Sequence, residues 1–164
     1  MSKYEEFGQE FQNLTDSKMK TGTLGNRIMA QKIAYILFML IGKDFEYTEF
    51  SWYLHGVFCW DLWRDMMKFG SPSNATLDSI HLTRLEYIKE DLSNAGLTDY
   101  FTNSDDLELI TTILYCAKNG NGQKELFEEN TSLIANVMAL KNKFDEDQIK
   151  RAISVTNKVK WDFN

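Results

Sequence analysis

Cys59 and His55 are the side chains of this 164-residue chain best suited to nucleophilic chemistry, and they lie four positions apart. A cysteine–histidine pair supports covalent catalysis when the imidazole reaches the sulfur and holds it as a thiolate. Gly56 interrupts the spacing, and the neighbours Phe58 and Trp60 indicate an apolar setting, which raises a thiol pKa. Because buried free cysteines are common, we interpret Cys59 as structural and predict no catalytic residue. An enzyme using this pair is kept as a third hypothesis.

Residue types that bind metals or phosphates are present but do not form a known motif. The histidines and cysteines are His55, His81, Cys59 and Cys116, and none has CxxC or HExxH spacing. The acidic clusters at 90–91, 105–108 and 125–129 fall at expected helix starts or exposed faces, which is typical of solvated surface. The Asn-Gly-Asn-Gly turn at 119–122 lacks the lysine of a phosphate loop. We therefore expect neither a metal nor a cofactor.

Large aromatic residues are concentrated between Phe50 and Trp63. Trp52 and Tyr53 should face opposite ways on an extended segment, and Gly56 supplies the backbone freedom for a tight turn. Some rings should then be exposed, as in interface hot spots. The predicted contact residues are Trp52, Tyr53, His55, Gly56, Phe58, Trp60, Trp63 and Arg64. The alternative is that the first helix, with its apolar residues at positions 7 and 11, covers the outer face.

The charge balance argues against a general nucleic-acid binder. The net charge is −6 and the pI about 5.0, and the basic residues between 141 and 160 are interrupted by acids at 145–147. Two cysteines and a polar, acidic start without a leader pattern predict a cytoplasmic protein with reduced thiols. The apolar run 33–41 is too short to cross a bilayer, so it is expected to be a buried core helix.

The apolar periodicity predicts a mainly α fold of about six or seven helices in a single domain over 1–164. A single proline favours helices over a loop-rich sandwich. Helices are predicted at 3–14, 27–41, 60–69, about 76–94 (capped by Asn74 or Thr76), from 104 (capped by Ser104), 124–141 and 145–158 (capped by Asp145). Alternating aromatic residues predict a short strand or β-hairpin near 45–55.

With these elements in place, the chain resembles the YwgA-like family of small microbial proteins, and more distantly the SocA-like (Panacea) antitoxin domain. The likeness extends over about residues 24–155, with weaker matches at 107–115 and 140–152. The matching residues are Arg27, Gln31, Lys32, Tyr35 and Leu37 in one helix, and Phe50, Trp52, Tyr53, His55 and Gly56 in the aromatic segment. The chain departs from the family pattern at Val57, Phe58 and Cys59, where proline, tyrosine and a helix-capping serine are usual.

The resemblance implies a compact α-rich domain that works by protein contact and not by catalysis. Our first hypothesis is therefore a non-enzymatic protein-binding module, antitoxin-like or an accessory protein of a phage or mobile element, with a toxin or host factor as partner. The alternative is a DNA-binding regulator with a winged-helix-like arrangement, which requires a basic stripe joining 141–160 to Lys32 or Arg84. We expect no membrane association, and the sequence does not specify an oligomeric state.

Overall fold

The fold is mainly α, as the sequence predicted. The computed structural model describes residues 1–127 and 130–164. In this part of the chain seven α-helices, three short 3₁₀ helices and one β-hairpin are found. The elements are α1 (Lys3–Thr15), α2 (Leu24–Ile41), η1 (Gly42–Asp44), β1 (Ser51–Tyr53), β2 (Gly56–Phe58), α3 (Trp60–Phe69), α4 (Ser79–Ala95), η2 (Leu97–Phe101), α5 (Ser104–Lys118), η3 (Gly122–Leu126), α6 (Thr131–Leu140) and α7 (Glu146–Thr156).

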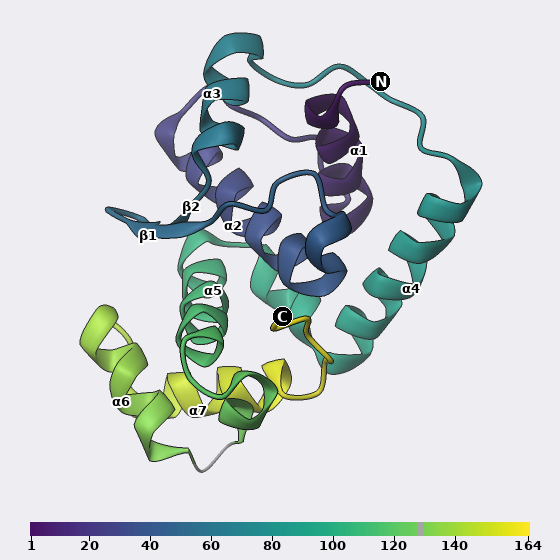
Figure 1. The fold of residues 1–164 in the computed structure, drawn as a ribbon. Helices are drawn as coiled ribbons and strands as arrows, with labels where there is room; N and C mark the ends of the chain where they lie inside the picture. Colours follow the sequence, from purple (N-terminus) through teal and green to yellow (C-terminus); the bar gives the residue numbers. More distant parts are fainter. Residues whose placement is uncertain (128–129) are drawn as a thin grey trace.

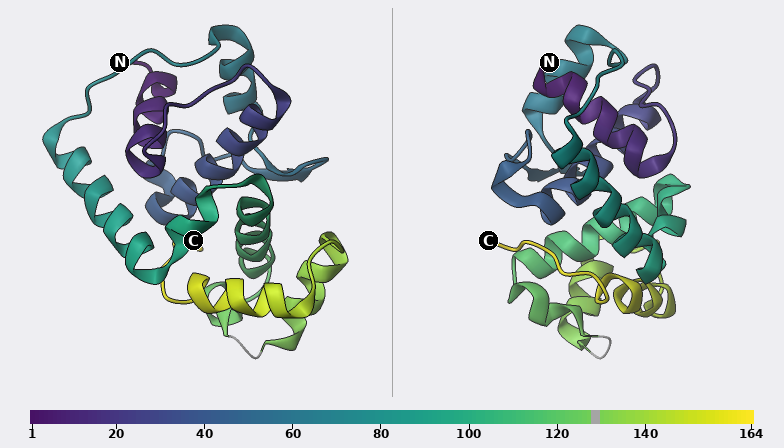
Figure 2. Two further views of the ribbon diagram at one scale, coloured as in Figure 1. Left: turned by 180° about the vertical axis from the view of Figure 1, so that it is seen from behind. Right: turned by 90° about the vertical axis from the view of Figure 1, so that its right-hand side faces the viewer.

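Helix α2 is the centre of the molecule. It packs against α1, α3, α5 and β2, and most of its second half is buried. In Figure 1 the hairpin and α1 flank it on opposite sides and α3 lies above it, while α5, α6 and α7 form the lower half of the molecule. Helix α4 runs along the side opposite the hairpin, which projects from the body (Figures 1 and 2). The C-terminal segment returns to the centre, where the Asp162 N–H donates to the Met39 carbonyl at 2.6 Å.

Side-chain caps define where most helices begin. Ser2 and Glu5 form a capping box at α1, and Asp145 with Gln148 forms another at α7, which confirms the predicted cap there. The predicted caps of α4 and α5 were wrong: Asp78 caps α4, two residues after Thr76, and Asn103 caps α5, one residue before Ser104. In each case the side chain that accepts the N3 amide lies just outside the helix, and sequence periodicity alone does not distinguish neighbouring cap candidates.

The helix predicted at 124–141 is not continuous. Residues 122–126 form η3, and α6 begins only at Thr131; residues 128–129 lie outside the described part of the chain. Asn130 separates the two elements, because its Oδ1 accepts from the Leu133 N–H at 2.9 Å and its Nδ2 donates to the Glu125 carbonyl at 3.1 Å. Because Asn130 caps α6 and also hydrogen-bonds to η3, the two elements do not join into one continuous helix.

The β-hairpin is present but lies later in the chain than predicted. Residues 45–50 form no paired strand and begin with a bend, and the paired strands are β1 and β2, with Trp52 opposite Val57 and Tyr53 opposite Gly56. Phe45 and Tyr47 instead enter the core, which explains their alternating pattern. Gly56 has a φ of 101°, a value that L side chains rarely adopt, so the predicted need for glycine at this turn is confirmed.

Helix α2 is also the segment to consider as a possible membrane span. Among the described residues, the stretch Leu24–Asp44 is the one segment long and apolar enough to span a bilayer. About 56% of it is buried inside the fold, however, and the core helix of a globular protein meets the same criteria of length and hydropathy. Its packing against four neighbouring elements agrees with the predicted core helix.

Candidate functional site

The hairpin is attached to the body by two polar side chains of α2. Gln31 is buried, and its Nε2 donates to the Cys59 carbonyl at 3.0 Å while its Oε1 accepts from the Cys59 N–H at 2.8 Å. Lys32 is also buried and donates from Nζ to the His55 carbonyl at 2.8 Å. Cys59 offers no side-chain cap to α3, and Gln31 satisfies the backbone of this N-cap residue instead. These bonds fix both ends of β2.

Lys32 is an unusual residue to bury, and the charges that act on it are those of Glu108, Lys141 and Lys143. Burial lowers its pKa from 10.5 to about 8, because the apolar core disfavours the ammonium form. Glu108 opposes this shift, while Lys141 and Lys143, which both form ion pairs with Glu108, add to it. The lowered pKa follows from the burial of Lys32 beneath the hairpin turn. There its amine donates a hydrogen bond to the backbone carbonyl of His55.

The hairpin has an inner and an outer face, as the alternation of its residues predicted. Trp52 faces inward, where its ring lies 4.8 Å from that of Tyr115 on α5, and Lys141 Nζ lies 5.5 Å from the Trp52 ring. Tyr53 faces outward and is 48% exposed. Trp52 was one of the predicted contact residues, but the structure makes it an anchor of the hairpin on α5 and separates it from the outer rings.

The outer face carries a continuous aromatic cluster. Ring centroids are 5.4 Å apart for Tyr53 and Phe58, 4.8 Å for Phe58 and Trp60, and 5.5 Å for Phe58 and Trp63. Leu54 at the turn and Trp60 at the start of α3 are 78% and 52% exposed. We call Tyr53, Leu54, Phe58, Trp60 and Trp63 the aromatic surface. Tyr53, Leu54 and Trp60 are exposed and the rings of Phe58 and Trp63 are half-buried, and a contiguous apolar patch of this kind often marks a binding site.

An apolar pocket of about 220 Å³ opens within the aromatic surface. The start of α2 forms its floor with Leu24, Ile28 and Gln31, and the hairpin and α3 form its walls. Its lining is almost wholly apolar, so it suits one inserted hydrophobic side chain better than a polar metabolite. Arg27 packs against one of the lining residues, Trp63, with its guanidinium 5.3 Å from that ring, and its Nη1 donates to the Thr21 carbonyl at 2.9 Å.

The remaining predicted contact residues take different places. His55 is exposed at the turn and lines the pocket, whereas Gly56 is buried beneath it. Arg64 is exposed on α3 and forms an ion pair with Asp61. The structure therefore brings together Tyr53, Phe58, Trp60, Trp63 and His55, places Arg64 nearby on α3, and turns Trp52 away.

The first helix does not cover the outer face of the hairpin. Phe7 on α1 packs edge-to-face against Phe45 and Tyr47, at centroid distances of 5.9 and 5.8 Å, and against Phe11 at 6.3 Å. These rings fill the core on the other side of α2. The alternative in which the first helix covers the aromatic segment is thus wrong, because the extended residues 45–47 occupy its apolar stripe.

Cys59 has the environment of a structural thiol. It is fully buried, and burial raises its pKa above the ordinary value, which is the opposite of what a nucleophile needs. His55, its proposed partner, lies exposed at the turn and interacts with the core only through its backbone carbonyl. Cys116 is likewise shielded, and burial raises its pKa to about 11.

Three of the lysines that a DNA-binding stripe would require are engaged with acids. Lys141 and Lys143 pair with Glu108, Lys143 also reaches Asp105, and Lys150 pairs with Glu146 on the same helix. Lys32 is buried. Charges that are paired within the fold are not available to neutralise phosphates.

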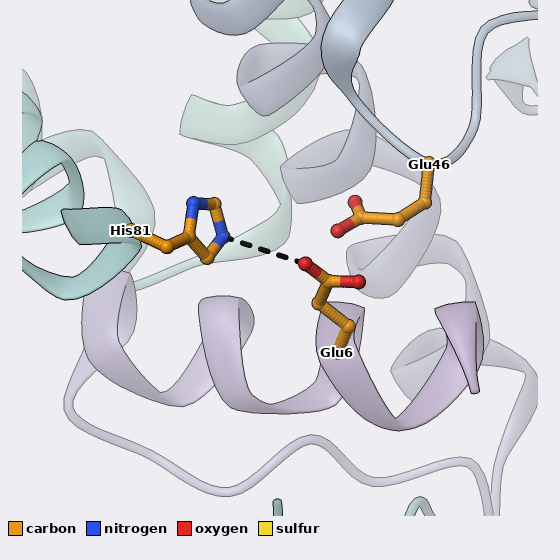
Figure 3. Close-up of side chains that lie close together, drawn as sticks. All are labelled: Glu6, Glu46 and His81. Carbon is orange, nitrogen blue, oxygen red and sulfur yellow. Dashed lines mark ion pairs between the residues drawn. The ribbon is translucent and has the colours of Figure 1, made fainter. Parts of the chain in front are cut away.

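A second group of polar side chains lies on the other side of α2, and His81 is the one member that the sequence analysis considered. Glu6 and Glu10 project from successive turns of α1, Glu46 follows η1, and His81 lies in the first turn of α4. We call these four residues the Glu–His cluster. Figure 3 shows the carboxyl groups of Glu6 and Glu46 and the imidazole of His81 pointing toward one another. No short motif could have revealed it, since its members come from three distant segments; the i, i+4 glutamates were the one local signal.

The cluster has more negative groups than its surroundings compensate. Burial and the charges of Glu46 and Glu6 raise the pKa of Glu10, and Arg84 opposes the shift only as its weakest contributor. Burial also raises the pKa of Glu46. Carboxyl groups held this close cannot all be ionised without a proton or another cation between them.

We compared the chain with protein-family models, with curated proteins and with solved structures, and none of the three comparisons gave a match. Function is therefore argued from the two sites above.

Proposed function

We propose that this protein is a non-enzymatic protein-binding module and that its aromatic surface is the contact site. The observation that carries the proposal is the exposed ring cluster around a small apolar pocket, held rigidly by Gln31 and Lys32. Aromatic side chains surrounding an apolar pocket are the arrangement that dominates binding energy at protein interfaces. The raised pKa of Cys59 and the ion-paired lysines support this reading over an enzyme or a DNA-binding regulator.

The partner we propose is a cytoplasmic protein that inserts one large apolar side chain between the hairpin and α3. A pocket of about 220 Å³ is smaller than those that usually hold metabolites or cofactors, so it fits an anchor residue better. In keeping with the resemblance to YwgA-like and SocA-like proteins, we propose an antitoxin-like or mobile-element accessory role. In support of that likeness, the matching residues Gln31 and Lys32 are the ones that hold the matching aromatic segment.

Site-specific photo-crosslinking tests the proposal. A photoreactive phenylalanine replaces Leu54 at the hairpin turn, and the matched control replaces Ile80 on α4; these side chains are 78% and 83% exposed. In the native cell we expect one discrete crosslinked protein from position 54 and not from position 80. The Trp60→Ala variant should abolish that product, while Tyr87→Ala, another exposed aromatic residue on α4, should retain it.

A crosslink of equal strength at both positions, or one that survives Trp60→Ala, would contradict the proposal. Salt-dependent binding of the purified protein to DNA, lost when Lys141 and Lys143 are neutralised, would support the DNA-binding alternative instead.

A further inference from the structure

The Glu–His cluster has the composition of a cation site. One ligand atom from each of Glu6, Glu46 and His81 lies within 4.8 Å of the others. His81 Nε2 also lies 2.8 Å from Glu10 Oε2 and 3.9 Å from Glu6 Oε1. Carboxylate oxygen and imidazole nitrogen are both ligands that first-row divalent metals accept.

Glu10 gives an independent reason to expect a bound cation. It is completely buried, and its Oε1, like the buried Glu46 Oε2, has no N–H or hydroxyl donor within the described structure; the two carboxyl groups lie within hydrogen-bond reach of each other, so a proton or another cation must lie between them. A buried carboxylate oxygen without a partner is strongly unfavourable. The His81 imidazole contacts Glu10 and Glu6, and Arg84 acts on Glu10 through its charge.

The backbone holds these side chains where an ion can reach them. The Asp78 side chain caps α4 by accepting from the His81 N–H at 2.8 Å, which fixes the first turn that carries the imidazole. The connection leading to α4 crosses α1 closely at Gly8, where a Cβ atom would lie 2.4 Å from Pro72 Cγ. His81 and Glu6 remain partly exposed, with side chains 20% and 37% accessible, so an ion can enter from solvent.

We propose that the Glu–His cluster binds one divalent first-row transition-metal ion. Glu6, Glu46 and His81 supply ligands, and Glu10 supplies a further oxygen from the buried side. His81 Nε2 and Glu10 Oε2 are hydrogen-bonded at 2.8 Å in the ion-free structure, so an ion bound by both would replace this hydrogen bond. The imidazole favours Zn²⁺ or Co²⁺ over Mg²⁺ and Ca²⁺, which prefer oxygen alone.

Metal titration of the full-length, tag-free protein after chelator treatment tests this proposal. Co²⁺ is followed by visible absorption and Zn²⁺ by calorimetry. We expect saturable binding of one ion per chain and a Tm that rises with Zn²⁺ concentration but not with Mg²⁺ at the same concentration.

Two variants locate the site. Glu46→Gln and His81→Gln should each weaken Zn²⁺ binding by about 100-fold or more. Glu46→Gln removes one of the crowded charges, so its metal-free form should melt no lower than the wild type, which separates loss of binding from loss of fold. His55→Gln, which removes the exposed histidine at the hairpin, is the control and should bind Zn²⁺ like the wild type.

Three outcomes would overturn the proposal. One is the absence of saturable Co²⁺ and Zn²⁺ binding, with Glu46→Gln merely more stable; the carboxyl groups then share a proton. The second is binding that is unchanged in both cluster variants. The third is binding that His55→Gln abolishes, which would place the ion at the hairpin.

Discussion

Replacing Gln31 by leucine should release the hairpin from α2 and strongly destabilise the protein. The substitution keeps the side-chain size but removes both hydrogen bonds to the Cys59 backbone. Each backbone group left unsatisfied in the core costs ~1–3 kcal/mol, and the added apolar burial returns roughly 1–2 kcal/mol. We therefore expect the free energy of unfolding to fall by about 2–3 kcal/mol, the middle of the resulting range of roughly 0–5 kcal/mol and a large part of the ~5–15 kcal/mol typical of a domain.

Urea unfolding measures the total loss, and hydrogen exchange locates it. The Cys59 amide is protected in the native state by the Gln31 side chain, so it should exchange much faster in Gln31→Leu than in the wild type. Helix α5 is buried independently of this bond. The exchange rates of its amides should therefore increase only as much as the loss of global stability requires.

Gln9→Leu is the matched control within α1. Its Nε2 bonds only to the Asn13 side chain at 2.9 Å on a partly exposed surface, so the free energy of unfolding should change by less than ~0.5 kcal/mol. The reasoning would be refuted if Gln31→Leu lost less than ~1 kcal/mol and left the protection of the Cys59 amide unchanged.

Three further predictions concern the same region. Lys32 is protonated in the unfolded chain up to its ordinary pKa of 10.5 but only up to a pKa of about 8 in the fold. The stability of the wild type relative to Lys32→Met should therefore rise with pH across this window, by up to ~1.4 kcal/mol per pH unit, and stay level below it. Urea unfolding at several pH values checks this, and a stability difference that falls as the pH rises would contradict it. Cys59 should react with iodoacetamide at neutral pH only as fast as the protein opens, so mass spectrometry should show slow labelling that denaturant accelerates, whereas rapid labelling of the native protein would restore the nucleophile hypothesis. Trp52→Ala removes an inward ring and should lower the free energy of unfolding by about 2 kcal/mol, whereas Trp60→Ala, on the exposed face, should lower it by less than ~1 kcal/mol. Equal losses in thermal or urea unfolding would show that the two faces were assigned wrongly.

The amino-acid sequence by itself determined the class of fold and the local character of the hairpin. Apolar residues recur at helical spacing along α1 and α3, and helices formed there with nearly the predicted bounds. The opposite orientation of Trp52 and Tyr53 and the positive φ at Gly56 are also local properties, set by strand geometry and by the missing Cβ atom. Local chemistry was less informative about helix caps, since several polar residues near each start could serve.

Only the tertiary structure decided which of these residues are available for function. Trp52 and Trp60 are alike in sequence, but α5 lies against the inner face of the hairpin and leaves the outer one open, so one ring became an anchor and the other part of a surface. Gln31 and Lys32 acquired their roles only because the hairpin folds back over α2. The Glu–His cluster joins three segments far apart in the chain, and because proximity between such segments depends on packing, no spacing along the sequence encodes it.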